Sequence, residues 1–123
     1  MSDRPRRILL VEDEPLVAML EQEMLTEAGY EVVGPFSRLA RAREAARSEA
    51  IDAATLDVNL FGEFVYPVAE ILAVRGIPFA FLSGYGADAG GAFPDAPVLS
   101  KPFGSELLLQ TIQGMLRQRM ASG

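Results

Sequence analysis

One stretch of the chain, Ala53-Ala54-Thr55-Leu56-Asp57-Val58-Asn59-Leu60, is a mostly apolar run that carries a single carboxylate, at Asp57. A run of this kind, bounded by turn signals, predicts a strand that is buried on both faces of a sheet. Asp57 would lie where the strand leaves the sheet, and open parallel sheets bind ligands at that carboxyl end. A lone aspartate is also a common cap for the following loop, so the other strand ends must decide between the two interpretations.

Length and composition favour one cytoplasmic domain. The chain has 123 residues, of which 50% are hydrophobic, and this predicts a single domain over 1–123 with a core from about 7 to 119. No apolar run approaches the roughly 20 residues of a membrane-spanning helix, and the run at 8–11 is too short for a signal peptide. The net charge of −6 argues against nucleic-acid binding, which needs a basic surface. We therefore expect neither a membrane nor a nucleic acid as a partner.

The residue types that are missing restrict the chemistry further. The chain has no cysteine and no histidine, which excludes disulfides, thiolate or imidazole metal sites, and a phosphohistidine of its own. Any metal must be held by oxygen ligands, which favours a hard cation such as Mg²⁺. Lys101 is the only lysine among 11 basic residues. An isolated lysine in an arginine-rich chain indicates a site that needs a compact ammonium group on a flexible stem.

Turn residues divide the chain into alternating strands and helices. Continuous apolar runs predict strands at 7–11, 30–34, 53–57, 77–82 and 96–100. Helices are predicted at 15–28, 38–47, 67–74 and 105–119. Gly34-Pro35 is expected to end the second strand, Gly62 to form the turn of a loop at 60–63, and Pro97 to place the fifth strand at an edge. The segment 84–94 contains four glycines, so we expect only a short or mobile fourth helix there.

Apolar residues at helical spacing predict the buried helix faces. The stripes are Leu16, Leu20, Met24 and Ala28 in the first helix, Leu39, Ala42 and Ala46 in the second, and Leu108, Ile112, Met115 and Leu116 in the last. The second helix also carries Arg38, Arg41, Arg43 and Arg47. These arginines fit a solvated face better than a partner surface. Together the elements predict an α/β, flavodoxin-like doubly wound fold, with a five-stranded parallel sheet of order 2-1-3-4-5.

The predicted strand ends carry polar residues that this topology would bring to one edge. The first strand is followed by Glu12 and Asp13, the third ends at Asp57, the fourth is followed by Ser83 and the fifth by Lys101. Two carboxylates about 5 Å apart repel by about 3 kcal/mol at an effective dielectric near 20, and a divalent cation removes that cost. A lysine and a hydroxyl beside the cation would bind a phosphoryl group, and Asp57 is then the candidate nucleophile.

These motifs resemble the receiver domains of two-component response regulators over residues of about 7–119. The resemblance lies in Glu12-Asp13 after Leu-Leu-Val, Asp57 within Leu-Asp-Val-Asn, Ser83 before Gly84, and Lys101-Pro102-Phe103. The segment 81–86 also resembles a subgroup of stand-alone alphaproteobacterial receivers with a Phe-Ala-Thr-Gly-Tyr-type motif. That subgroup is linked to general stress signalling.

The resemblance implies a role for each matched residue. Asp57 would be the phosphoacceptor and a ligand of Mg²⁺, with Asp13 binding the cation directly, Glu12 through water and Asn59 through its backbone carbonyl.

Ser83 and Lys101 would contact the phosphoryl group, and the peptide bond before Pro102 would be cis. Val98 stands where receivers usually carry a switch aromatic. Tyr85 either takes that switch role or anchors the loop after Gly84. We also expect residues 84–96 to change most on phosphorylation, and to be less protected from hydrogen exchange than the core.

Two functions of different classes remain open. The first is a single-domain response regulator that takes its phosphoryl group from a histidine kinase or phosphotransfer protein. It would signal to a still unknown downstream protein through changed contacts, or act as a phosphate relay or sink, as a monomer or weak dimer. It would be no enzyme beyond its own phosphorylation and dephosphorylation. The alternative is a constitutive protein-binding module that keeps the fold and does not depend on phosphate. A metal-dependent phosphatase is less well supported, because Asn59 stands where a second acid or base would be needed.

Overall fold

A computed structural model describes residues 4–84 and 90–122 of the chain. Its main sheet is parallel throughout, in the order β2-β1-β3-β6-β7. The strands are β1 (Arg7–Val11), β2 (Glu31–Phe36), β3 (Ala53–Asp57), β6 (Phe79–Ser83) and β7 (Val98–Ser100). Since β6 and β7 are the fourth and fifth strands of this sheet, the predicted flavodoxin-like order is confirmed, with the last strand at an edge.

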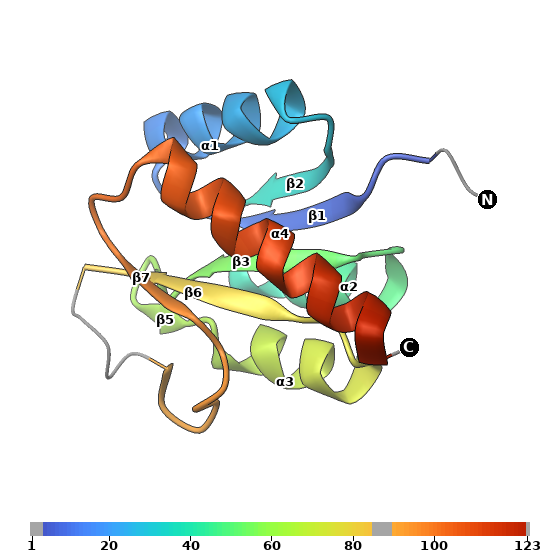
Figure 1. Ribbon diagram of the computed structural model, residues 1–123. Helices are drawn as coiled ribbons and strands as arrows, with labels where there is room; N and C mark the ends of the chain where they lie inside the picture. Colours follow the sequence, from blue (N-terminus) through green and yellow to red (C-terminus); the bar gives the residue numbers. More distant parts are fainter. Residues whose placement is uncertain (1–3, 85–89, 123) are drawn as a thin grey trace.

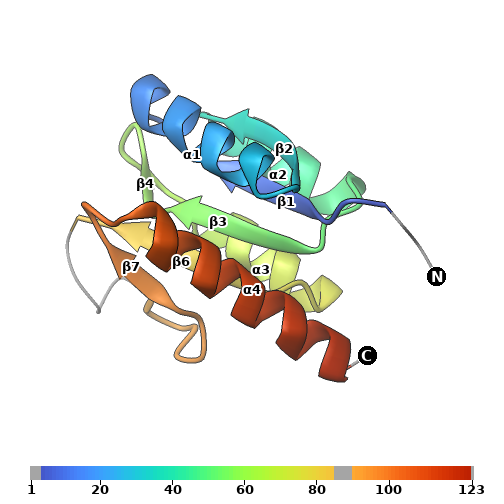
Figure 2. The same ribbon diagram turned by 45° about the horizontal axis from the view of Figure 1, so that its top comes forward.

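In residues 4–84 and 90–122, four helices cover the two faces of the sheet. They are α1 (Pro15–Glu27), α2 (Leu39–Ser48), α3 (Tyr66–Arg75) and α4 (Ser105–Ser122). Figures 1 and 2 show α1 and α4 on one face and α2 and α3 on the other. Helices α2 and α3 pack against the strands in one hydrophobic cluster, and α1 and α4 pack against them in a second. Among the described residues, no helix has the length and apolar character needed to cross a membrane.

The buried face of α1 is not the one that the apolar spacing predicted. Leu16 and Leu20 are 67% and 50% exposed, whereas Ala18, Glu21 and Leu25 are buried. The buried face is rotated by about 100° from the predicted one, the angle of one helical residue. Apolar residues occur all round this helix, so periodicity alone could not select the face. As a result, the side chain of Glu21 is buried, whereas Leu16 and Leu20 are exposed to solvent.

The second strand does not end at Gly34-Pro35. It continues to Phe36 through a bulge, because Leu9 pairs with Val33 whereas Val11 pairs with Phe36. Pro35 is tolerated because β2 is an edge strand, where a missing N–H removes no bond of the sheet. Beyond the bulge the N–H of Glu12 donates to the carbonyl of Phe36 at 2.9 Å. The bulge therefore supports the backbone of Glu12 at the end of β1.

Replacement of Gly34 by alanine is expected to destabilise the fold by about 2 kcal/mol. Gly34 has φ of 115°, and a Cβ there would lie 2.8 Å from the carbonyl oxygen of Leu10. The matched control is Gly114→Ala in α4, where a Cβ would meet nothing within 4 Å. That change should be neutral or slightly stabilising, since alanine favours helices. Urea denaturation measures both free energies of unfolding, and equal values for the two variants would contradict the prediction.

A short hairpin follows β3 where a loop was expected. Strands β4 (Asn59–Leu60) and β5 (Glu63–Phe64) pair antiparallel around a two-residue turn. Both turn residues, Phe61 and Gly62, have positive φ, as this type of tight turn requires. The prediction of Gly62 as a turn residue is therefore confirmed, while the pairing on either side of it was missed.

The segment between β6 and β7 lacks a regular helix over 90–97, where successive turns are closed by the N–H groups of Phe93 and Ala96. The ring of Phe93 packs edge-on against Phe79 at 5.3 Å between centroids. The rest of the expected fourth helix, residues 85–89 with Tyr85, lies outside the described residues.

The arginines of α2 and its N-terminal cap lie in solvent, as predicted for a solvated face. These are Arg38, Arg41, Arg43 and Arg47. The guanidinium carbon of Arg38 lies 4.6 Å from the centre of the Phe61 ring.

Candidate functional site

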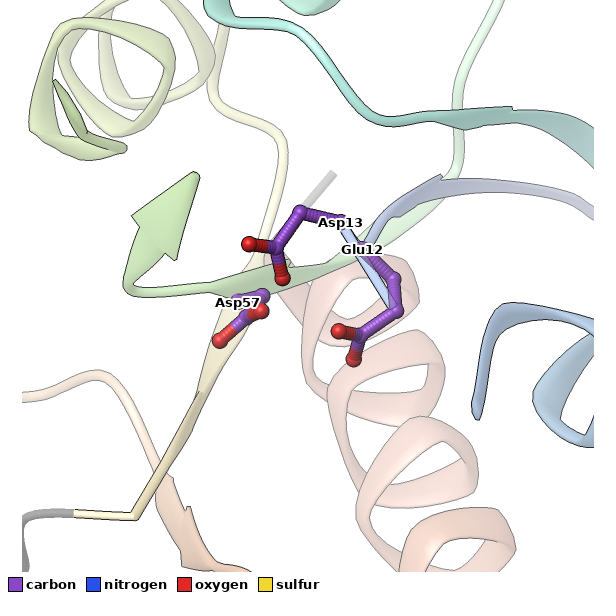
Figure 3. A group of neighbouring side chains, drawn as sticks. All are labelled: Glu12, Asp13 and Asp57. Atoms are coloured by element: carbon purple, nitrogen blue, oxygen red, sulfur yellow. The ribbon is translucent and has the colours of Figure 1, made fainter. Parts of the chain in front are cut away.

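Three carboxylates meet at the carboxyl ends of two neighbouring strands. Glu12 and Asp13 directly follow β1, and Asp57 is the last residue of β3. Each contributes an oxygen, and the three oxygens lie within 4.8 Å of one another. Figure 3 shows their side chains gathered around one space. Glu12 and Asp57 are almost fully buried, at 1% and 7% exposure. An all-oxygen donor set of this size fits a hard divalent cation.

Lys101 supplies the positive charge of the cluster. Its Nζ donates to Glu12 Oε1 at 3.1 Å, lies 3.4 Å from Asp57 Oδ1, and lies 3.7 Å from Glu14 Oε1. The chain reaches this position because β7 ends at Ser100 and the N–H of Lys101 donates to the Ser83 carbonyl at 2.8 Å. Although burial disfavours its charge, Glu12 and Asp57 hold the pKa of Lys101 above its ordinary value.

Ser83 is the last residue of β6, and it is buried at the same edge of the sheet. The preceding residue, Leu82, pairs with Asp57, so Ser83 lies one step beyond the carboxylate along the neighbouring strand. Gly84 follows it in solvent. The peptide bond between Lys101 and Pro102 is cis.

Asn59 lies in the hairpin that borders the cluster. Its side-chain Oδ1 accepts a hydrogen bond from the N–H of Gly62 at 2.7 Å, which holds the turn. The other residue of that turn, Phe61, donates its N–H to Asp13 Oδ2 at 3.2 Å. The sequence did not predict this contact, because it depends on the pairing of β4 with β5, which places the N–H of Phe61 beside Asp13.

The carboxyl groups of the cluster differ in their affinity for protons. Burial, followed by the carboxyl groups of Glu12 and Asp13, raises the pKa of Asp57 to about 8. Burial also raises the pKa of Glu12, although Asp57 and Lys101 oppose that shift. For Asp13 burial acts in the same direction, but hydrogen bonds with Asp57 and from Phe61 N–H outweigh it and lower the pKa. The cluster therefore retains a proton near neutral pH, which a cation would displace.

A fourth carboxyl group lies beneath the cluster and was missed in the sequence. Glu21 of α1 is 1% exposed, and no group in the described part of the chain donates a hydrogen bond to its oxygens. Burial raises its pKa to about 7. Its spacing from Ala18 and Leu25, three and four residues away, is the signal that could have placed it on the buried face.

Replacement of Glu21 by glutamine is expected to stabilise the protein above pH 7. A carboxyl whose folded pKa is raised contributes stability below its unfolded pKa and loses it as pH rises through the folded value. For a rise from 4.5 to about 7, the loss is roughly 3 kcal/mol, which the variant avoids. Urea denaturation at about pH 5 and pH 8 measures this, with the exposed Glu23→Gln as control. A variant no more stable than wild type at the higher pH would contradict it.

Comparison with known proteins supports a common family. The chain is 41% identical to SdrG from Sphingomonas melonis Fr1, with a TM-score of 0.77 over 94% of this chain and 99% of that one. A structure of SdrG in a BeF₃-activated conformation is 40% identical, with a TM-score of 0.75 over the same shares. A response regulator receiver protein from Sinorhizobium medicae is 29% identical, with a TM-score of 0.86 over 96% of this chain and 99% of that one.

A curated relative is longer. The transcriptional regulatory protein PdtaR of Mycobacterium tuberculosis is 32% identical over 89% of this chain, but the chain spans only 56% of PdtaR. No protein-family model matches the chain. The near-complete overlap with SdrG and with the receiver protein, together with the carboxylates and lysine at the carboxyl ends of this chain's strands, shows that the chain belongs to the response regulator receiver domains of two-component systems.

Proposed function

We propose that this protein is a single-domain response regulator that accepts a phosphoryl group on Asp57 in a Mg²⁺-dependent reaction. One observation carries the proposal: a buried aspartate lies within reach of two other carboxylates and of the chain's only lysine, whose Nζ is 3.4 Å from Asp57 Oδ1. A buried acidic cluster of this kind is costly unless cations balance it. Lys101 supplies one positive charge, and the remaining negative charge favours a divalent ion.

The metal ligands proposed are Glu12, Asp13, Asp57 and the backbone carbonyl of Asn59. When bound, Mg²⁺ would supply positive charge that neutralises the carboxylates and the oxygens of the transferred phosphoryl group. The protein's own task is to hold these oxygens in place. Phe61 N–H positions Asp13, and Lys101 holds Glu12 and Asp57.

The reaction is a transfer between two proteins. An oxygen of ionised Asp57 attacks the phosphorus of a donor phosphohistidine, the phosphorus–nitrogen bond breaks, and the imidazole leaves with the electron pair. Lys101 and the Ser83 hydroxyl then pair with phosphoryl oxygens, which stabilises the transferred charge. The donor is a histidine kinase or a phosphotransfer protein, since this chain has no histidine. Attack of water on the same phosphorus reverses the modification, and no other substrate is processed.

Output is proposed to occur through changed contacts with a downstream protein, or as a phosphate relay or sink in the cytoplasm. The proposed subgroup is that of stand-alone receivers with the Phe-Ala-Thr-Gly-Tyr-type motif. The relative SdrG has a BeF₃-activated conformation, which supports the proposal that this chain can also be activated. The region 84–96 is proposed to change most, with Tyr85 as a candidate switch in place of the aromatic that Val98 replaces.

The decisive experiment is phosphoryl transfer to the purified protein from a small acyl or amido phosphate, read by intact mass. A single phosphate adduct should form with Mg²⁺ and be absent with EDTA. Borohydride reduction followed by peptide mapping should locate the adduct at Asp57. An adduct that forms equally in EDTA, or that maps elsewhere, would refute the proposed chemistry. A folded protein that takes phosphate from no small donor and no kinase would favour the constitutive binding module.

Mg²⁺ binding is expected to strengthen as pH rises towards 8. The raised pKa of Asp57, about 8, means that the cation must displace a proton at neutral pH. Below that pKa the affinity should rise by up to about tenfold per pH unit, and it should level off above it. Isothermal titration calorimetry in buffers of different ionisation enthalpy would report both the affinity and the released proton. An affinity that is constant between about pH 6 and pH 8 would contradict the expectation.

A further inference from the structure

A pocket of about 740 Å³ opens at the end of the molecule opposite the acidic cluster. It lies where β6 begins, between the end of α3, the turns before β7 and the last turns of α4. Its apolar wall includes Ile77, Phe79 and Met115, which are buried, and Phe93, which is partly buried. Pockets that bind small organic molecules have volumes of roughly 300–1,000 Å³ and mostly apolar linings.

Two arginines that line this pocket are held by main-chain carbonyls of a single segment. Arg75, from α3, donates through Nη1 to the carbonyls of Ala46 and Glu49, at 2.6 and 2.9 Å. Arg119, from α4 on the other face of the sheet, donates through Nη1 to the carbonyl of Ile51 at 2.7 Å. In the described part of the chain, the hydrogen bonds of both guanidinium groups use only Nη1, so their other N–H groups can bind a ligand.

The charge of the pocket differs from that of the whole protein. The chain has a net charge of −6, whereas the pocket lining contains Arg75 and Arg119 against one acid, Asp95. Arg119 also lies 3.7 Å from Asp52, which partly offsets its charge. A fixed arginine is a strong partner for a carboxylate or sulfonate, because its planar fork is already ordered before the ligand arrives.

We propose that this pocket binds a small organic anion with an aromatic or branched aliphatic body. The apolar wall formed by Ile77, Phe79, Phe93 and Met115 would bury the body, and Arg75 and Arg119 would pair with the anionic group. The site lies at the amino ends of the strands, away from Asp57, and the inference does not rest on the phosphorylation chemistry. An Asp57→Asn variant should therefore bind the same ligand with unchanged affinity.

The test uses anilinonaphthalene sulfonate, which joins an aromatic body to one anionic group. Bound to the 123-residue protein, it should shift the amide signals of Ile77, Phe93 and Met115 in NMR spectra. The Arg119→Met variant should bind it roughly tenfold more weakly. Arg117→Met, an exposed arginine of the same helix outside the pocket, is the control and should bind normally. Neutral phenylnaphthylamine, which has the same body without the charge, should bind wild type more weakly than the sulfonate.

A second variant tests the proposal independently, in case Arg119→Met does not fold. Ala73 is exposed and lines the pocket, so the indole of Ala73→Trp should occupy part of the cavity and weaken binding without disturbing the core. Three results would overturn the proposal. They are shifts confined to the exposed leucines of α1, no shift at any residue with millimolar probe, or equal affinity for the neutral and the anionic compound.

Discussion

Replacement of Asp57 by asparagine is expected to abolish the phosphate adduct and, at the same time, to stabilise the metal-free protein at alkaline pH. The loss of the adduct follows from the proposed nucleophile, because an amide oxygen cannot form the acyl phosphate. The gain in stability follows from burial. Asp57 is 7% exposed, and its pKa in the folded state is about 8 against an ordinary 3.8.

The pH range of that gain follows from the sign of the shift. The native state holds the Asp57 proton more tightly than the unfolded chain, so wild type loses stability as pH rises from about 4 to above 8. At about pH 9 the asparagine variant should exceed wild type by on the order of 3 kcal/mol, since a coupled cluster shares its cost among several groups. Near pH 4 the difference should disappear.

With Mg²⁺ bound, wild type should become more stable than the Asp57→Asn variant. Binding to the native state raises the stability of wild type with the logarithm of the ratio between the free Mg²⁺ concentration and its dissociation constant. The variant, which lacks one of the proposed ligands, should gain much less. Urea denaturation with and without Mg²⁺ measures this, and Asp95→Asn, at an exposed acid far from the cluster, is the control. If the variant is less stable than wild type at about pH 9 without metal, the ionised Asp57 carboxylate does not destabilise the folded state, and the prediction is wrong.

Replacement of Lys101 by methionine is expected to have the opposite effect on stability. Nζ of Lys101 lies within 3.1 to 3.7 Å of oxygens from Glu12, Asp57 and Glu14. Removal of that charge leaves Glu12 and Asp57 buried without a compensating cation, which typically costs about 3 kcal/mol. The loss should be largest at alkaline pH, where both carboxyl groups would have to ionise, and smaller in acid, where they carry protons.

Phosphoryl transfer should also slow in this variant. If Lys101 pairs with the transferred group, its loss should lower the rate by about a hundredfold, as for other groups that stabilise transition-state charge. Arg117→Met, an exposed cation on α4, is the matched control and should change neither quantity. The double variant Lys101→Met/Asp57→Asn should recover much of the lost stability, because the charge that Lys101 balances is gone. Additive effects of the two changes would contradict a direct interaction between these side chains.

The order of the sheet could be predicted from the sequence alone. So could the position of five polar residues at one edge of it: Glu12, Asp13, Asp57, Ser83 and Lys101. Continuous apolar runs identify strands that are buried on both faces, and right-handed crossovers leave few arrangements of such strands. Once the strands are in order, the residue after each of them must lie at the carboxyl edge. No knowledge of side-chain packing is needed for that step.

The buried face of α1 and the end of β2 could not be predicted from the sequence, because both depend on contacts between elements. The apolar residues of α1 surround the helix, so contacts with the sheet select Ala18 and Leu25 and bury Glu21 with them. The bulge at Gly34 depends on pairing with β1, because a strand interrupted by Gly-Pro can resume only if its neighbour holds it.

The charges of the site also depend on distances that sequence does not contain. Asp57 has a pKa of about 8 because burial and two neighbouring carboxyl groups act on it together. Phe61 N–H reaches Asp13 only because β4 and β5 pair. Arg75 and Arg119 are 44 positions apart in the chain and lie on helices that cover opposite faces of the sheet. Both nevertheless donate to main-chain carbonyls of the segment 46–51. Local sequence specifies backbone and strand order, whereas electrostatic energies follow from atoms that only packing brings together.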